Sequence, residues 1–455
     1  MIHAFSVENF KSLKTERVDL SPLTILSGIN NSGKTTFIKS ILELFGFDDE
    51  KSNVLSGLPI LSNYTTKVFN NDTSNNINFH MKIDLNDDEY IELNISFKYS
   101  EKVKGGFPYY YKFFTKKGDK NFLLELSKDN PEDYYKIHSS LGLALLFGKV
   151  KENVDLPKVF SGIGDVKFIG FLPVQCILKF KDNNILYDWF DDDDDDNQNI
   201  QLAIKSSNEL LESIFNVKYI GPLRNHPKEF YFFEYRGLKI DSRGENTFEV
   251  LDRIQNRNIK FFASLDSNNL VEKSLIDAIN YWIEFFYGNA KLDLKKISEN
   301  LVQVMINGHS INNSGFGFSQ LIPIIVQALL LKKNELLLLE QPEIHLHPEL
   351  EYKLAYFLLC IAKNKRQIIA ETHSEHIINQ LILSKMKDET GKIDKIFKIY
   401  FLEKDVKGIT KFEKVLISEY GEIENWPKGF FDQYLNFTKE LVKLRKEKAL
   451  KNRVN

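Results

Sequence analysis

The chain has very few cysteines, since Cys176 and Cys360 are the only 2 among its 455 residues. Two thiols that lie so far apart in sequence have no metal-ligand spacing and cannot build a disulfide framework. Both are expected to be core thiols of a protein in a reducing compartment. The sequence therefore argues against a disulfide-stabilised domain and against a zinc site made of cysteines.

Long apolar runs are missing as well. No stretch approaches the roughly 18–20 residues that a membrane-crossing helix requires. The first residues, 1–7, are too few and are followed too soon by charge to form a secretory signal. We expect a cytoplasmic protein that makes no contact with a membrane.

Neither sign of charge is in large excess. The chain has 60 basic and 63 acidic residues and a formal net charge of -3. It lacks the overall polycationic character that is typical of many nucleic-acid-binding proteins. Any contact with DNA must come from a local patch or from an assembly.

Internal repeats and sustained heptads are also absent, so no long coiled coil is expected. The Asp run at 191–196 predicts a solvated loop, with a divalent-cation site as the alternative. The tail at 436–455 is rich in Lys and Arg, and two interpretations stay open for it. It forms a solvated terminal helix, or it contacts nucleic acid or an acidic partner.

What is present is a regular alternation of predicted elements. Apolar bursts between turn residues predict strands over 2–7, 17–20, 23–27, 78–85, 90–99, 122–126, 301–306, 335–339 and 367–370. Helical periodicity predicts helices over 35–45, 132–147, 200–215, 319–332, 348–363 and 375–383. Strands and helices that alternate in this way form a mostly parallel sheet covered by helices, so the predicted fold class is α/β.

The strongest motif is residues 28–35, GINNSGKT, between a predicted strand and a predicted helix. It matches the P-loop pattern, in which glycines turn backbone N–H groups toward phosphates at a helix N-terminus. Lys34 would reach the β- and γ-phosphates of ATP, and the Thr35 hydroxyl would bind Mg²⁺. The predicted phosphate-binding residues are Gly28, Asn30, Asn31, Ser32, Gly33, Lys34, Thr35 and Thr36.

A second motif is the apolar strand that ends in Glu340. In P-loop folds such a strand brings an acidic side chain toward the Mg²⁺ of the nucleotide. The sequence that follows Glu340, QPEIHLHP at 341–348, makes a simple buried strand a poor explanation. Thr35 and Glu340 are therefore the predicted magnesium ligands.

Residues 340–348 and 371–374 (ETHS) make a wider resemblance specific. They resemble the ABC-type ATPase core of RecF, of the overcoming-lysogenization-defect nucleases and of the ATPase subunits of bacterial anti-phage systems. The same resemblance extends to residues 9–13, 28–36, 221–224, 244–246, 420–422 and 426–431, but not to about 50–210. It implies an ABC/SMC-like ATPase head with a mixed sheet flanked by helices. The strand-like runs over 78–126 separately predict an antiparallel β subdomain, and the helical periodicity over 132–147 and 200–215 predicts an inserted helical region.

The resemblance also implies roles for single residues. Glu340 falls at the Walker B acid, and Gln341 at the position where many ABC ATPases have the glutamate that polarises water. Because an amide cannot accept the proton of the water, Glu343 and His347 are the nearest replacement bases. Alternatively, ATP is held as a structural switch without turnover. His373 matches the switch histidine that contacts the γ-phosphate.

Residues 314–320 (SGFGFSQ) resemble a degenerate ABC signature, which caps the ATP of the opposite subunit. Ser314 and Ser319 compete for the serine position, beside Gly315 and Gly317, and a simple helix-capping turn is the alternative. The signature implies a homodimer or higher homo-oligomer with shared ATP sites. Gln175 is a Q-loop residue or a plain loop glutamine.

We expect four parts in the chain. The ATPase lobe begins at 1–130 with the P-loop and the antiparallel sheet, is interrupted by a mainly helical region at 131–299, and resumes at 300–400. A C-terminal module with a basic tail occupies 401–455. The TOPRIM nuclease of the overcoming-lysogenization-defect proteins has no counterpart in residues 374–455, which contain no D-x-D.

The leading functional hypothesis is an ATP-binding regulatory subunit, using ATP and Mg²⁺, of an anti-phage defence complex. It would control a separately encoded nuclease of the HNH type, as in Septu, and contact DNA through that complex. Two alternatives stay open: a RecF-like DNA repair or recombination ATPase, and a non-hydrolysing ATP-sensing scaffold.

Overall fold

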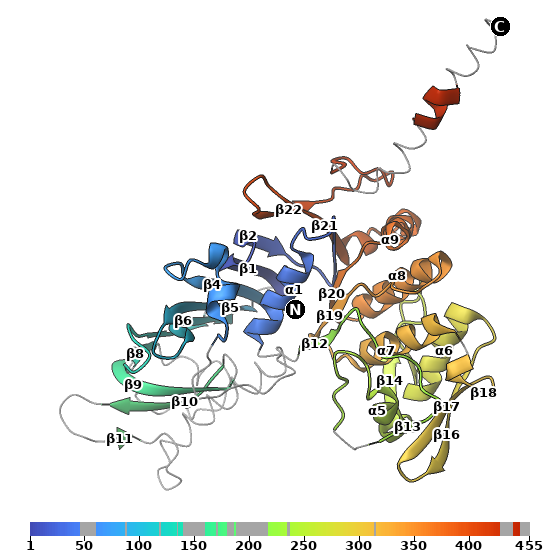
Figure 1. Ribbon diagram of the computed structural model, residues 1–455, viewed down its shortest axis with the longest axis horizontal. Helices are drawn as coiled ribbons and strands as arrows, with labels where there is room; N and C mark the ends of the chain where they lie inside the picture. The colour runs from blue at the N-terminus through green and yellow to red at the C-terminus, as the bar shows by residue number, and fades with distance from the viewer. Residues whose placement is uncertain are drawn as a thin grey trace, which may run out of the picture.

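The computed structural model describes most of the chain. The described residues are 1–45, 61–86, 89–117, 120–133, 135–139, 160–169, 172–179, 186–187, 217–233, 237–313, 315–427 and 440–445. Within them, a large antiparallel sheet forms one side of the molecule, and a helix-covered sheet forms the other (Figure 1). The expected α/β class, with a mixed sheet flanked by helices and an antiparallel subdomain, is confirmed.

The helix-covered sheet, here called the central sheet, has six strands among the described residues, in the order β12-β19-β20-β3-β21-β22. They are β12 (Val217–Ile220), β19 (Leu336–Glu340), β20 (Gln367–Glu371), β3 (Leu23–Gly28), β21 (Phe397–Lys404) and β22 (Thr410–Lys414). All neighbouring pairs are parallel except β21 and β22. The carboxyl ends of β3, β19 and β20 therefore meet at one edge, which is where the P-loop begins.

The central sheet is buried because its strands are apolar on both faces. Every residue of β3, β19 and β20 is buried, as expected for parallel strands covered by helices. Leu337 and Leu339 belong to a core shared with the helices of the C-terminal half, whereas Leu336 and Leu338 belong to a second core shared with the antiparallel sheet.

Six longer helices pack around these cores in the described residues. They are α1 (Lys34–Leu44), α5 (Thr247–Ile254), α6 (Leu275–Tyr287), α7 (Phe316–Leu330), α8 (Pro348–Lys363) and α9 (Glu375–Lys387). The fully buried ring of Trp282 on α6 lies 4.8 Å from the ring of Phe357 on α8. Ring contacts of this kind join the helical layer into one body.

The antiparallel sheet has ten strands among the described residues, in the order β11-β10-β9-β8-β7-β6-β5-β4-β1-β2. They are β1 (Ile2–Phe10), β2 (Leu13–Asp19), β4 (Ile77–Asn86), β5 (Glu89–Ser100), β6 (Gly105–Lys117), β7 (Lys120–Ser127), β8 (Tyr135–Ser139), β9 (Phe160–Ile169), β10 (Leu172–Lys179) and β11 (Leu186–Tyr187). Alternating burial along β5 turns Ile91, Leu93, Ile95 and Phe97 toward the core.

The region from 131 onward differs from the expectation. The predicted helix over 132–147 is wrong in its described part, because Tyr135–Ser139 forms β8, which pairs with β7. Strands β9 to β11 extend the same sheet, and among the described residues of the expected inserted region the helices are α5 and α6. The predicted helix over 200–215 and the Asp191–Asp196 run lie outside the described residues.

The C-terminal half carries small additional sheets. A sheet of four strands combines β13 (Tyr231–Phe232), β17 (Leu301–Ile306), β16 (Leu292–Ser298) and β18 (His309–Ser310), and a hairpin combines β14 (Asn258–Phe261) with β15 (Val271–Ser274). Short helical segments are α2 (Tyr64–Lys67), η1 (Phe69–Asn71), η2 (Ile311–Asn313) and η3 (Ile393–Lys395). Residues 440–445 of the basic tail are helical, and no described helix is long and apolar enough to span a bilayer.

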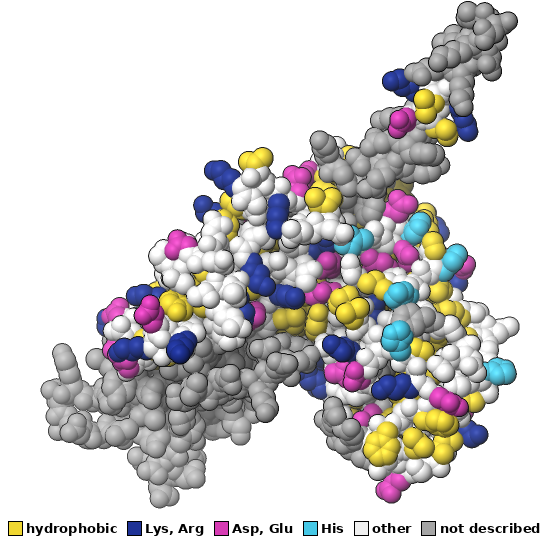
Figure 2. Space-filling model, viewed as in Figure 1, with side chains coloured by type: hydrophobic (Ala, Val, Ile, Leu, Met, Phe, Trp, Pro, Cys, Tyr) yellow, Lys and Arg dark blue, Asp and Glu magenta, His cyan; other side chains and the backbone are white. Residues whose placement is uncertain are grey.

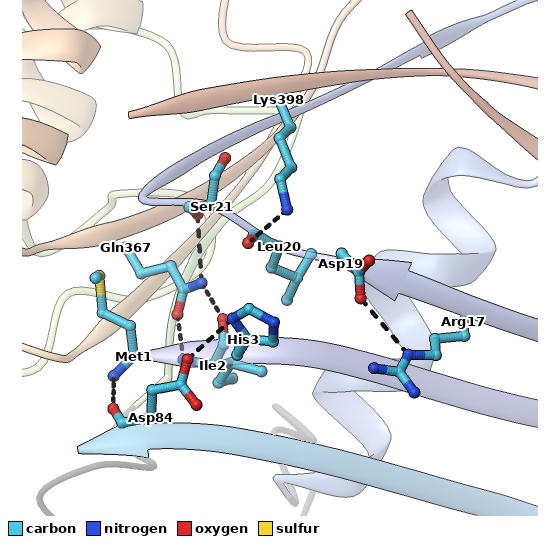
Figure 3. A network of polar contacts seen from close by, with 10 residues as sticks. All are labelled: Met1, Ile2, His3, Arg17, Asp19, Leu20, Ser21, Asp84, Gln367 and Lys398. Atoms are coloured by element: carbon cyan, nitrogen blue, oxygen red, sulfur yellow. Dashed lines mark hydrogen bonds and ion pairs between the residues drawn. The ribbon is translucent and has the colours of Figure 1, made fainter. Parts of the chain in front are cut away.

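One buried side chain joins the two sheets. Gln367, at the start of β20, accepts a hydrogen bond from the Ile2 amide (2.8 Å) and donates to the Ile2 carbonyl (2.7 Å) and the Ser21 carbonyl (3.3 Å) (Figure 3). Because the Gln367 side chain is buried, these three hydrogen bonds satisfy polar groups that would otherwise be costly. They fix the antiparallel sheet against the amino edge of the central sheet.

Candidate functional site

The P-loop connects β3 to α1 and needs glycine at two positions. Gly28 and Gly33 have φ of +144° and +110°, values that favour glycine. A Cβ atom on Gly28 would lie 2.2 Å from the Leu402 carbonyl oxygen, and one on Gly33 would lie 2.2 Å from the Thr410 Oγ1. The two glycines therefore let the loop approach β21 and β22 closely.

A buried threonine supports the P-loop from behind. The Thr410 hydroxyl donates to the Ser32 carbonyl (2.9 Å) and shares a second hydrogen bond with the Ser12 hydroxyl (2.8 Å). The Thr410 amide donates to the Ser12 carbonyl (2.9 Å). This contact explains Ser12 within the 9–13 motif, whereas Thr410 has no sequence signal of its own.

The Lys34 ammonium lies inside the loop. Its Nζ donates to the carbonyls of Gly28 (3.1 Å) and Ile29 (2.9 Å), and the residue is 3% exposed. Burial lowers the pKa of Lys34, while the charges of Glu371 and Glu343 oppose this effect. Asn30 and Asn31 are exposed at the loop, and Thr36 is half-buried on α1.

Two carboxylates lie side by side beneath the loop. Glu340 and Glu371 end the neighbouring strands β19 and β20 and are paired in register. The Thr35 hydroxyl donates to the Glu371 Oε2 at 2.8 Å. Glu371 is the acid next to the P-loop because β20 lies between β3 and β19. The sequence motifs indicated Glu340 as the only carboxylate ligand of Mg²⁺ and gave no such role to Glu371.

The electrostatics of the pair Glu340 and Glu371 favour the binding of a cation. Burial and the Glu371 charge raise the pKa of Glu340 to about 7, although the Tyr219 hydroxyl donates to it at 3.0 Å. Burial also raises the pKa of Glu371, against the Thr35 hydrogen bond and the Lys34 charge. Both carboxylates are at most 5% exposed, so their negative charges are unfavourable without a counter-ion.

The donor set fits Mg²⁺. The ion prefers hard oxygen ligands and is usually held by one or two carboxylates together with substrate phosphates and water. Thr35, Glu340 and Glu371 supply one hydroxyl and two carboxylates. Among the described residues no group of three or more His, Cys, Asp or Glu side chains could hold a metal ion.

Glu343 connects the segment after Glu340 to the segment after Glu371. Its Oε1 accepts a hydrogen bond from the His373 amide at 2.7 Å, and its buried Oε2 has no partner in the described part of the chain. Burial raises the pKa of Glu343. The Gln341 amide donates to the Glu371 carbonyl at 2.8 Å, so Gln341 and Glu343 are both tied to the end of β20.

His373 lies on the segment that follows Glu371, and its ring is half-buried. Burial and the positive charge of Lys34 lower its pKa. Its neutral form is therefore favoured at neutral pH, which suits a hydrogen bond to phosphate through either ring nitrogen.

Arg224 is a further buried charge at this edge and was named in the sequence only as part of the 221–224 motif. Its Nη2 donates to the Gln341 carbonyl (3.0 Å), and its Nε donates to Gln320 Oε1 (3.3 Å) on α7. The Nη1 has no partner among the described residues. Burial lowers the pKa of Arg224 to about 10, opposed by Glu343, so the guanidinium stays charged at neutral pH.

The expected signature lies at the start of α7. The helix begins at Phe316, three residues before the predicted start at 319, and Gly315 precedes it with φ of +78°. A Cβ atom on Gly317 would lie 2.8 Å from the His345 carbonyl oxygen, so this glycine packs against the loop after Glu340. Ser319 is buried, at 6% exposed, whereas Ser314 lies outside the described residues.

The structure also shows where the predicted candidates His347 and Gln175 lie. His347 is exposed and caps α8, since its Nδ1 accepts from the Glu349 amide at 3.3 Å. Gln175 lies on the strand β10, near the far end of the antiparallel sheet from β1, so both loop interpretations, Q-loop residue and plain loop glutamine, are wrong. Histidine side chains gather on the visible face over the half of the molecule that carries α7, α8 and α9 (Figure 2).

Comparisons with known proteins give a family for most of the chain. Residues 1–378 match the family model described as AAA ATPase domain. Residues 395–444 match the one described as Protein of unknown function (DUF3696). No curated protein matches the chain.

Solved structures with a similar arrangement include the SMC head domain from Thermotoga maritima. It has 10% identity and a TM-score of 0.38, over 91% of this chain and 99% of that chain. The SmcHead bound to the C-winged helix domain of ScpA has 10% identity and a TM-score of 0.42, over 92% of this chain and 98% of that chain. At these values neither likeness says anything about function.

Proposed function

The chain belongs to the AAA ATPase domain family, and on that premise we propose that it binds Mg²⁺-ATP at the P-loop, hydrolyses it slowly and thereby controls a partner protein. The observation that carries this proposal is the carboxylate pair Glu340 and Glu371 beneath the loop, with the Thr35 hydroxyl on Glu371. Two buried, adjacent acids with raised pKa values are costly for folding, so function explains them better than stability does.

The residues of the proposed ATP site have separate roles. Backbone N–H groups of the P-loop and the Lys34 ammonium bind the phosphates, and Thr35, Glu340 and Glu371 would hold Mg²⁺, which neutralises phosphate charge when bound. His373 contacts the γ-phosphate from the end of β20. Arg224 holds the Gln341 carbonyl and thereby positions the segment that carries Glu343.

Glu343 is the proposed general base. Its Oε1 is fixed by the His373 amide, and its Oε2 is free to accept a proton. The water oxygen attacks the γ-phosphorus while the bond to the β,γ-bridging oxygen breaks, and the water proton passes to Glu343. Gln341 can orient the water but cannot accept its proton.

We place the second half of each ATP site on another copy of the chain. Gly315 is exposed at the N-terminus of α7, and amides at a helix N-terminus attract phosphate. Gly315 and Gly317, with Ser314, would cap the γ-phosphate of the ATP in the facing subunit. Buried Ser319 is the weaker of the two serine candidates.

The proposed cellular role is ATP-dependent control of a separately encoded nuclease of the HNH type in a cytoplasmic anti-phage defence complex. The support is the resemblance of residues 340–348 and 371–374 to ATPase subunits of such systems. A RecF-like repair ATPase is the main alternative, and a non-hydrolysing ATP-sensing scaffold is the other.

Replacement of Lys34 by alanine tests the ATP site. The variant should lose at least about tenfold in ATP affinity and all measurable turnover. The reason is that the buried Lys34 ammonium is the positive charge with which the loop would bind the phosphates. Fluorescent-nucleotide binding and phosphate release measure the two effects. Lys116→Ala, an exposed lysine of β6, is the control. Equal ATP affinity in wild type and Lys34→Ala would refute an ATP site at this loop.

The cellular role has a separate test. Bacteria that carry this gene with its neighbours should reduce phage plaque formation by at least about tenfold, and Lys34→Ala should abolish the protection. An HNH nuclease should copurify with the wild-type chain. Unchanged plaque counts together with sensitivity of the deletion strain to DNA damage would replace the defence role by the RecF-like alternative.

A further inference from the structure

A pocket of about 510 Å³ lies at the amino edge of the central sheet. Its walls come from the turn before β14, from the turn between α7 and β19, and from the turn between α8 and β20. We call it the amino-edge pocket. Because β19 and β20 run through the sheet to Glu340 and Glu371, the pocket and the ATP site lie at opposite edges of the sheet.

The lining of the amino-edge pocket is strongly basic. Five exposed cations contribute to it, namely Arg257, Lys260, Lys332, Lys333 and Lys365. Lys363 and the buried Arg366 add two more, and no Asp or Glu is found among its described lining residues. This concentration stands out in a chain whose formal net charge is -3, and it produces a local field that attracts polyanions.

The nearby acids leave most of this charge uncompensated. Glu272 forms an ion pair with Lys260 at 3.4 Å on the surface. The negative charge of Glu335 interacts with the Arg366 guanidinium. The Lys332 amide donates to the Glu335 carboxylate at 2.9 Å. In the described part of the chain, the ammonium groups of Lys332, Lys333 and Lys365 form no ion pair with a carboxylate. Lys333 also repels the partly buried Met1 amine, whose pKa falls to about 6 mainly through burial.

The three basic segments are held together by hydrogen bonds. The Asn334 amide donates to the Lys365 carbonyl at 3.0 Å, which joins the two turns. Arg366 Nη2 and Asn364 Nδ2 both donate to the Lys260 carbonyl, at 3.0 and 3.3 Å. Arg366 is 6% exposed. The cations are therefore presented on a preorganised frame, as a binding site requires.

We propose that the amino-edge pocket binds the phosphate backbone of a nucleic-acid strand. A nucleoside triphosphate carries only about four negative charges, fewer than the cations around the pocket, whereas a strand supplies one phosphate per nucleotide. Phe262 and the partly exposed Leu270 add an apolar wall that suits sugars and bases. This site is separate from the proposed ATP function.

The test compares two full-length variants that lose the same charge. Lys332→Gln/Lys333→Gln/Lys365→Gln removes three exposed lysines of the pocket, and Lys98→Gln/Lys104→Gln/Lys407→Gln removes three exposed lysines elsewhere. Fluorescence anisotropy with labelled 30-mer single- and double-stranded DNA is measured between 50 and 200 mM salt. The pocket variant should bind at least about tenfold more weakly, with a salt slope reduced by roughly 2–3.

Every outcome decides the proposal. The control variant should bind DNA like wild type, and the pocket variant should bind fluorescent ATP like wild type, because the P-loop is at the other edge of the sheet from the pocket. Equal DNA affinity in the pocket variant and wild type overturns the proposal. The proposal is also overturned if the wild-type protein does not bind DNA but binds inorganic tripolyphosphate through these lysines. If the wild-type protein does not bind ATP, that result contradicts the proposed ATP site and not the proposed nucleic-acid site.

Discussion

Replacing Glu340 with glutamine is expected to slow Mg²⁺-dependent ATP turnover at least about 100-fold and also to stabilise the ATP-free protein by about 2 kcal/mol at pH 8. Turnover falls because one of two carboxylates directed at Mg²⁺ is lost. Stability rises because burial and Glu371 raise the pKa of Glu340 to about 7, so the ionised group opposes folding. Glutamine can still accept the hydrogen bond from Tyr219.

The stabilisation must depend on pH in one direction. A carboxyl with a raised pKa in the folded protein favours folding at low pH, and this contribution is lost as the pH rises through about 7. The difference between variant and wild type should therefore be near zero at pH 4.5 and complete at pH 8. Urea unfolding without nucleotide measures it. Glu403→Gln, an exposed acid on β21, should change neither stability nor turnover, and a less stable Glu340→Gln at pH 8 would contradict the explanation.

Replacing Glu343 with glutamine should slow turnover by about 10²–10⁴-fold and leave ATP affinity unchanged. The amide oxygen can still accept the His373 hydrogen bond that now reaches Oε1. The variant loses the proton acceptor at Oε2 and the negative charge that acts on Arg224. Because burial raises the pKa of Glu343, its carboxylate is a stronger base than an exposed glutamate. Single-turnover phosphate release and nucleotide binding separate the two steps.

His347→Ala is the matched comparison, since His347 is the other candidate for the base. Its exposed ring caps α8, so the variant should lose about 1 kcal/mol of stability and keep its turnover. Gln341→Glu should raise turnover, because it adds a base next to Glu343. Normal turnover in Glu343→Gln combined with a large loss in His347→Ala would reverse the assignment.

The buried strands of the central sheet were predictable because they are continuous apolar runs. The bounds of β3, β19 and β20 lie within one residue of the predicted ones. Outside the central sheet, the strand β17 (Leu301–Ile306) and the helix α8 (Pro348–Lys363) have the predicted bounds. In contrast, 135–139 has mixed periodicity, and its strand form depends on pairing with β7. A local pattern contains no information about such a distant partner.

The site was predictable where one motif carries it and not where the fold assembles it. The P-loop residues follow from a contiguous pattern. Glu371 is adjacent to Thr35 only because β20 inserts between β3 and β19, which the order of the sequence does not reveal. Thr410 and Arg224 act through contacts with backbone carbonyls of Ser32 and Gln341, and such contacts leave no characteristic spacing.

The position of β3 has a consequence for how the protein is made. Both of its neighbours, β20 and β21, come from the last quarter of the chain, and so does Thr410 behind the P-loop. A chain still on the ribosome has made the whole P-loop motif but no sheet to hold it, and its apolar β3 is exposed to chaperones. The P-loop therefore gains its neighbouring strands and the Thr410 support only after residues 367–414 have been made, so products that terminate before β20 lack the frame of the loop.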